Sequence, residues 1–148
     1  MDLNTRLTEL ARQLDAHQLN QLSADEWLLL TADGLALQIT RTDTGTGTGT
    51  SIVLACRPDD RELDPRWLPL LLSYNGLLTT TGGMVMGLIG NQRLLIQLPV
   101  AIADDDALAS VALNFLQLVR EWQLRLAQPC SPASAEPHSL TMMSAIKG

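Results

Sequence analysis

The sequence predicts an α+β domain in which three helices accompany a twisted, five-stranded antiparallel sheet, in the order α-β-β-β-α-β-β-α. Three observations predict this class: leucine-rich helical spacing near both ends, an Asp33-Gly34 turn between two apolar runs, and a second pair of apolar runs around Gly90. At 148 residues the chain has room for one ordinary domain. We expect that domain to span residues 1–128, and we expect the Pro- and Ser-rich residues 129–148 to form a flexible tail.

The first helix is expected from about Leu3 to His17. Leu3, Leu7, Leu10 and Leu14 recur at steps of four, three and four residues, which is the spacing of one helical face. His17 would end this helix, where an imidazolium interacts favourably with the negative end of the helix dipole.

Three strands are expected next, at residues 26–31, 35–40 and 51–56. Asp-Gly between the first two is typical of a type I′ hairpin turn, in which both central residues have positive φ. The third run is apolar on both faces, which favours a central strand. The Thr/Gly repeat at residues 44–50 is interpreted as a flexible hairpin loop, because it has GxGxG spacing and lacks the Lys and the following helix of a phosphate-binding loop.

A second helix follows the third strand. Asp64 is a suitable N-cap, and Pro65 fits the first helical position, where its missing N–H does no harm. Gly76 is a plausible end of the helix.

Two further strands are expected at residues 84–89 and 93–98. Gly90-Asn91 between them predicts a tight turn and therefore antiparallel pairing. Pro99 is expected to end the second of these strands, because proline cannot donate to a sheet ladder.

A long amphipathic helix is expected after Asp104, Asp105 and Asp106. These carboxylates are interpreted as capping groups rather than metal ligands, because no His, Glu or Asn lies nearby in the sequence to complete a coordination shell. One apolar stripe runs along the predicted helix, formed by Leu108, Val111, Ala112, Phe115, Leu118, Val119, Trp122 and Leu126.

The composition argues against several classes of function. The net charge is −6, Lys147 is the one lysine, and the arginines are scattered, so neither nucleic acid nor an anionic membrane is an expected partner. No apolar run approaches the roughly 20 residues that cross a bilayer, so membrane insertion is not expected. The chain also shows no recognisable signal peptide, which together with its two cysteines favours a cytoplasmic protein.

No pattern of catalytic or cofactor-binding residues stands out. Cys56 and Cys130 lie far apart in the sequence, and Cys56 lies in an apolar run typical of a buried cysteine. There is no GxSxG motif, no paired-carboxylate pattern and no Cys/His ladder. We therefore expect no enzyme activity, no cofactor and no bound metal.

Four segments in the second half of the chain follow one another in an informative order. They are Leu71-Leu72-Ser73-Tyr74-Asn75, Gly82-Gly83-Met84-Val85-Met86-Gly87-Leu88, Leu94-Leu95-Ile96-Gln97-Leu98-Pro99, and the closing helix through Phe115 and Trp122. This succession resembles the class I chaperones of bacterial type III secretion, which show Leu-Leu-x-x-Asn, a Gly-x-x-x-Gly-Leu strand, a Leu-Pro ending and a Leu-rich final helix. The resemblance covers about residues 3–127 and is closer from residue 68 onward.

The resemblance implies a dimeric cytoplasmic chaperone that binds the N-terminal segment of a secreted effector and keeps it soluble and competent for secretion. It implies as partners a second copy of the chain, the effector and the secretion ATPase. The residues expected at the dimer interface are Leu71, Leu72, Leu78, Met84, Met86 and Leu88. The residues expected to contact the effector are Leu7, Leu10, Trp27, Leu29, Leu37 and Ile39.

Two alternatives stay open at this point. Any of these twelve residues could instead belong to the ordinary hydrophobic core, since Leu7 and Leu10 share a helical face with Leu3 and Leu14. A regulatory or scaffold domain of the same fold, binding a folded protein, is the alternative function.

Overall fold

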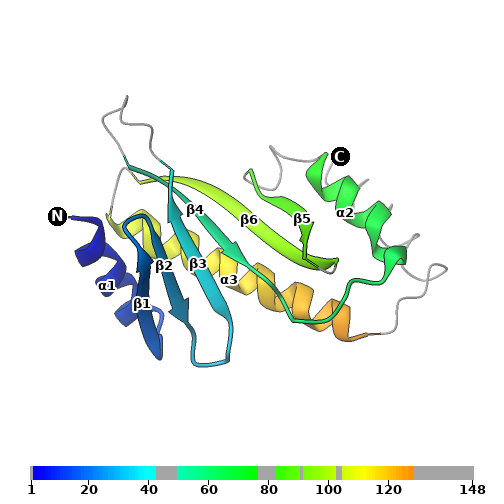
Figure 1. Ribbon diagram of the computed structural model, residues 1–148, viewed down its shortest axis with the longest axis horizontal. Helices are drawn as coiled ribbons and strands as arrows, with labels where there is room; N and C mark the ends of the chain where they lie inside the picture. Colours follow the sequence, from blue (N-terminus) through cyan, green and yellow to red (C-terminus); the bar gives the residue numbers. More distant parts are fainter. Residues whose placement is uncertain (1, 43–49, 77–82, 91, 103–104, 129–148) are drawn as a thin grey trace.

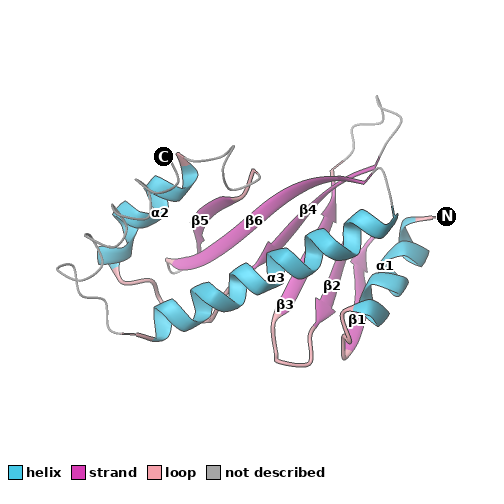
Figure 2. Cartoon of the chain, turned by 180° about the vertical axis from the view of Figure 1, so that it is seen from behind, coloured by secondary structure: helices cyan, strands magenta, loops and turns pink. Residues whose placement is uncertain are grey.

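Six antiparallel strands form one sheet, with helices against one of its faces (Figures 1 and 2). The computed structural model describes residues 2–42, 50–76, 83–90, 92–102 and 105–128. Helices α1 and α3 lie on the same face of the sheet, and α2 lies beside the edge strand β5 (Figure 2). The strand order is β1-β2-β3-β4-β6-β5. The elements are α1 (Leu3–Gln13), β1 (Gln18–Ser23), β2 (Glu26–Leu30), β3 (Ala36–Arg41), β4 (Thr50–Cys56), the 3-10 turn η1 (Pro65–Trp67), α2 (Leu68–Asn75), β5 (Val85–Ile89), β6 (Arg93–Ile102) and α3 (Asp105–Ala127).

The α+β class is confirmed, but the expectation of five strands is wrong. The additional strand is β1, with the polar sequence QLNQLS, which pairs antiparallel with β2. The first helix is correspondingly shorter than expected, since it ends at Gln13 and Asp15 has a φ of 56°. His17 donates its N–H to the Leu30 carbonyl at 2.8 Å, so it leads into β1 and does not end a helix. An edge strand is held through its backbone, so its side chains need not show the apolar alternation that marks a half-buried strand.

The hairpin β2–β3 is confirmed, with Leu29 opposite Leu37, but its turn is not type I′. The Thr31 carbonyl accepts from the Gly34 N–H at 3.1 Å, and Gly34, with a φ of 90°, is the one turn residue with positive φ. The turn is therefore a three-residue loop that uses glycine only at its last position, so Asp33 keeps an ordinary backbone. The expected central strand is also confirmed, because β4 lies between β3 and β6.

The second hairpin, β5–β6, is confirmed as an antiparallel pair, but Pro99 does not end its strand. Strand β6 continues through Pro99 to Ile102, pairing with β4 along that length. The shorter β5 begins at Val85, opposite Gln97, so among the described strands β6 beyond Gln97 has a neighbour only on the β4 side. Proline is tolerated in a strand where its missing N–H would face away from the ladder.

The second helix begins as a 3-10 turn. Asp64 caps this turn as expected, accepting from the Arg66 N–H at 3.0 Å, and Pro65 occupies its first position. The turn continues directly into α2, which Gly76 ends. The chain therefore follows the predicted start and stop signals, although the regular α-helix begins only at Leu68.

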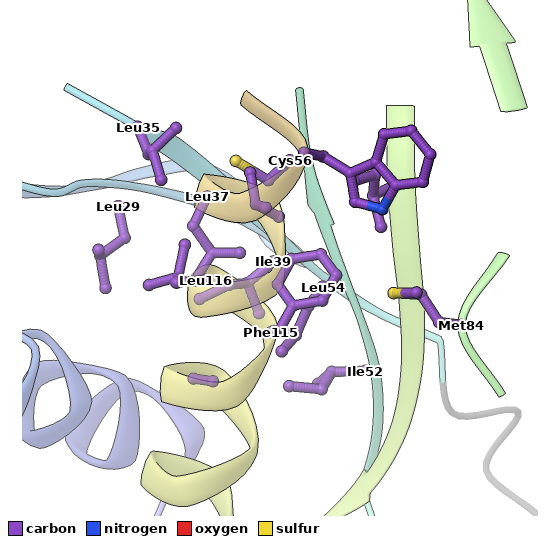
Figure 3. Close-up of a cluster of buried hydrophobic side chains, with 14 of the residues drawn as sticks. Leu29, Leu35, Leu37, Ile39, Ile52, Leu54, Cys56, Met84, Phe115 and Leu116 are labelled. Atoms are coloured by element: carbon purple, nitrogen blue, oxygen red, sulfur yellow. The ribbon is translucent and has the colours of Figure 1, made fainter. Parts of the chain in front are cut away.

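The core lies between the sheet and the helices α1 and α3. Figure 3 shows Leu29, Leu37, Ile39 and Leu54 of the sheet close to Phe115 and Leu116 of α3. Leu116 was absent from the predicted stripe, because the buried arc of α3 is wider than one row of residues. None of the helices in the described ranges has the length and apolarity needed to span a membrane.

The turn between β2 and β3 is fixed to α3 by an ion pair. Asp33 accepts from Arg120 Nε at 2.6 Å and also from the hydroxyl of Thr31. The Arg120 guanidinium, together with the Thr31 hydroxyl, lowers the pKa of Asp33 to about 2. The two residues are 87 positions apart, so this contact ties two distant parts of the chain together.

Candidate functional site

The six residues expected to contact an effector all lie in the hydrophobic core. Their side chains are at most 3 % exposed, and they come from α1, β2 and β3. Trp27 also satisfies its indole N–H internally, by donating to the side-chain oxygen of Asn4 at 2.9 Å. These residues therefore lie beneath the surface of this half of the molecule, and their contact with a partner stays a prediction. They are Leu7, Leu10, Trp27, Leu29, Leu37 and Ile39.

The residues expected at a dimer interface divide into two groups. Leu71, Met84 and Met86 are buried within the chain, whereas Leu72 is 71 % exposed and Leu88 is also exposed. Leu78 lies outside the described residues. Neighbouring positions on α2 turn in different directions, because each residue advances about 100° around a helix.

The exposed members, Leu72 and Leu88, belong to a larger group whose other three members the sequence prediction did not include. Of the eight large hydrophobic side chains exposed in the described ranges, five lie on α2 and β5. We refer to these five as the α2–β5 apolar set: Leu68, Leu72, Val85, Leu88 and Ile89. The composition of α2 and β5 already indicates such a surface, since α2 is apolar around most of its circumference and cannot bury all of it on one side; the sequence does not show which of these residues are exposed.

Helix α2 is held in place by aromatic contacts with α3. Trp67 and Tyr74 pack edge-on against Trp122, with ring centroids 6.1 Å and 5.3 Å away. The guanidinium of Arg125 lies over the Trp122 ring at 5.4 Å. Such pairs add about 0.5–1.5 kcal/mol beyond area burial, so three of the five aromatic residues of the chain fix the position of α2.

Asn75, the last residue of α2, binds the backbone of β5. Its side-chain nitrogen donates to the Met86 carbonyl at 2.7 Å, and its side-chain oxygen accepts from the Met86 N–H at 2.8 Å. One side chain thus satisfies both backbone groups of a residue on the sheet edge. This contact couples the exposed face of α2 to the strand that carries the rest of the apolar set.

The opposite edge of the sheet is β1, which sequence reasoning missed. The backbone groups of Leu30 face β1, because the Leu30 carbonyl accepts from the His17 N–H. Those of Leu28, two residues earlier, therefore also face β1, where Asn20 lies opposite Leu28 and directs its own backbone groups toward β2. Because successive residues of a strand direct their backbone groups to opposite sides, the N–H and C=O of Leu19 and Gln21 face away from β2. No residue of the described ranges hydrogen-bonds to these four groups.

The described residues also form a cleft of about 370 Å³ where α3 ends beside η1. Its acidic residues include Asp59 and Asp64, which pair with Arg61 at 3.0 Å and Arg66 at 2.7 Å. With Glu62 the lining holds three carboxylates against two guanidiniums, which leaves one negative charge in excess and does not favour an anion. The lining comprises Asp59, Arg61, Glu62, Leu63, Asp64, Arg66, Trp67, Leu94, Leu126, Ala127 and Gln128.

The described part of the chain contains no metal-binding cluster and one buried cysteine. No group of three His, Cys, Asp or Glu residues within it could hold a metal ion. Burial raises the pKa of the Cys56 thiol to about 12, so this sulfur is protonated and unreactive at neutral pH. The capping role expected for Asp104, Asp105 and Asp106 concerns side chains outside the described set, and Cys130 and residues 44–49 of the Thr/Gly repeat also lie outside it. Thr50, expected to end that loop, is instead the first residue of β4.

The chain was also compared with known proteins. The family model described as the Tir chaperone protein (CesT) family matches residues 5–123. Neither the comparison with curated proteins nor the comparison with solved structures found a match. The matched range begins in α1 and ends in α3, so it includes every strand of the sheet.

Proposed function

The chain belongs to the Tir chaperone protein (CesT) family of class I type III secretion chaperones, and on that premise we propose that it acts as a homodimer that binds the N-terminal segment of a secreted effector. Chaperones of this family are not enzymes; they serve effectors of type III secretion. The proposal adds the dimer, the extended state of the bound segment and a cytoplasmic location. The secretion ATPase is retained as a proposed further partner.

The α2–β5 apolar set is the observation that best supports the dimer. Leu72, at 71 % exposed, places most of a large apolar side chain in water when the chain is alone. Burying apolar surface gains about 25 cal/mol per Å², and a two-fold interface buries the same patch on both copies. Beneath this surface lie Leu71, Met84 and Met86, which would support the interface from the core.

The effector segment is proposed to lie along the half of the molecule formed by α1, β1, β2 and β3. An extended peptide can add to an exposed sheet edge through its backbone while its side chains occupy neighbouring surface. The backbone groups of Leu19 and Gln21, to which no described residue hydrogen-bonds, offer such an edge, and the exposed Leu22 lies next to them. The six core residues expected to contact the effector lie below this surface and, in this proposal, shape it.

Co-expression with the product of a neighbouring gene, followed by limited proteolysis, tests the effector half of the proposal. A chaperone should protect a short N-terminal stretch of its partner that is rapidly cleaved when the partner is alone. Equal cleavage rates with and without the chain would contradict the proposal. Protection of a whole folded domain instead would favour the alternative, a regulatory or scaffold domain.

Light scattering after size-exclusion chromatography tests the dimer half. The chain is expected to elute with twice its 16.1 kDa mass across a range of concentrations. A monomer that persists at high protein concentration would refute the dimer. That result would leave the effector half to be judged by the proteolysis experiment.

A further inference from the structure

The strand register determines which neighbouring strand the N–H and C=O of each residue in β4 and β6 face. In an antiparallel sheet a residue directs its N–H and C=O to one side, and the next residue directs them to the other. The Thr42 N–H donates to the Ser51 carbonyl, so odd-numbered residues of β4 face β3 and even-numbered residues face β6. In the register of β4 with β6, Ile52 lies opposite Val100, so even-numbered residues of β6 face β4. The odd-numbered residues, Pro99 among them, therefore face the β5 side.

Two positions on that side could accept an added strand, and each is closed in a different way. On β5, Met86 faces outward, and Asn75 already occupies both its N–H and its C=O. Leu88 is then the one remaining outward-facing residue of this strand. An added antiparallel strand forms hydrogen-bonded residue pairs at every second residue of the strand it joins. One free outward-facing residue provides a single such pair, which is too few to hold a strand.

The second position is the end of β6 that extends past β5. Here the outward-facing residues are Pro99 and Ala101, since β5 begins opposite Gln97. Proline has no N–H to donate, so the open end of β6 keeps a donor only at Ala101. Proline on an exposed strand edge is a known means of preventing edge-to-edge association.

The β1 edge keeps two residues with which an added strand could pair, and its bulge, between Gln21 and Ser23, lies at one end of them. Leu19 and Gln21 are two residues apart, both direct their backbone groups outward, and no described residue hydrogen-bonds to those groups. The strand contains neither proline nor lysine. From this contrast we infer that Asn75 and Pro99 close the β5–β6 side of the sheet to added strands, so that an extended polypeptide is admitted only at β1.

This inference rests on the proposed function only for the identity of the added strand, because the closure itself is a property of the chain alone. Asn75 and Pro99 then determine where a strand can bind without touching it at β1. They also keep the α2–β5 apolar set available for a second copy, because strand addition at β5 would place a peptide beside α2.

Amide hydrogen exchange of Asn75 variants tests the first closure. Asn75→Ala removes both hydrogen bonds, and the protection factor of the Met86 amide is expected to fall by about tenfold. Asn75→Asp keeps an acceptor for the Met86 N–H but loses the donor to its carbonyl, so it should retain more protection than Asn75→Ala. Asn114→Ala, an exposed asparagine on α3, is the matched control and should leave the Met86 amide unchanged. Unchanged Met86 protection in both Asn75 variants would overturn the role of Asn75.

Self-association of the double variant Asn75→Ala/Pro99→Val tests closure of the whole side. Light scattering is expected to show concentration-dependent species larger than those of the unmodified chain. As they form, protection of the Met86 amide should rise above its value in dilute Asn75→Ala, and the amide of residue 99 should become protected. If Asn75→Ala fails to fold, Pro99→Val alone provides the test, since it lies outside α2 and should still associate through β6. A folded variant that keeps the mass of the unmodified chain at every concentration would overturn the inference.

The two proposals fail in distinguishable ways. These experiments contain no effector, so loss of effector protection in the proteolysis experiment leaves their outcome unaffected. Conversely, if effector binding is found but the variants do not associate, the chaperone function stands and the closure is wrong.

Discussion

Replacing Leu72 by Ala gives the sharpest test of the dimer, because this side chain contributes almost nothing to the core of a single chain. Complete burial of a leucine is worth about 1.5–3 kcal/mol. With 71 % of the side chain exposed, its burial in an interface would gain about 1–2 kcal/mol per copy. A symmetric dimer contains Leu72 twice, so the variant should weaken association by about 2–4 kcal/mol, or about 30- to 900-fold in Kd.

The chain supplies a matched control in Leu124, which lies on α3 and is 68 % exposed. Leu124→Ala removes the same atoms from an equally exposed position outside α2 and β5. Sedimentation equilibrium should show the weakened dimer for Leu72→Ala and an unchanged dimer for Leu124→Ala. Under conditions where the chain is monomeric, the free energy of unfolding measured with denaturant should change by no more than about 0.5 kcal/mol in either variant. Equal weakening by both variants, or an unaffected Leu72→Ala dimer, would refute the interface.

Three further outcomes follow from the core and its ion pair. Arg120→Gln should lower the free energy of unfolding by up to about 1 kcal/mol at pH 7, after allowance for solvent screening. The pKa of Asp33 in the folded chain is depressed to about 2, so the difference in free energy of unfolding between the two proteins should be present above pH 4 and should shrink as the pH falls toward 2. Denaturant unfolding at several pH values measures this difference, and a difference that grows in acid would contradict the prediction. In a Cys130→Ser background, Cys56 should react with a thiol reagent at pH 8 only after denaturation, and rapid labelling of the native chain would be inconsistent with its burial. Leu37→Ala should cost about 2–5 kcal/mol of stability in thermal or chemical unfolding, and a near-neutral result would show that Leu37 is not part of the core.

The strands that bury one face were largely predictable from the sequence. The β2–β3 and β5–β6 hairpins and the central position of β4 follow from apolar runs and turn residues, which are local signals. The spacing of leucines likewise predicted the helices at the two ends of the chain. Strand β1 could not be found in this way, because it pairs at the edge with mostly polar side chains and no alternation marks it.

The candidate surfaces were predicted less well than the elements that carry them. The sequence identified Leu71 and Leu72 equally as interface residues, and only packing against α3 and β5 decides that the first is buried and the second exposed. Asn75 could be recognised as part of a family motif, but its two hydrogen bonds to Met86 depend on how α2 meets a strand eleven residues further along.

The order of amino acids by itself determined the helices, the hairpins and the set of side chains able to fill a core, since periodicity and turn chemistry act over a few residues. Only the tertiary structure decided which apolar residues remain in water and which strand edges keep free backbone groups. Exposure and edge pairing depend on neighbours that are distant in the chain: Pro99 stands in an open stretch of β6 only because β5 is shorter than its partner.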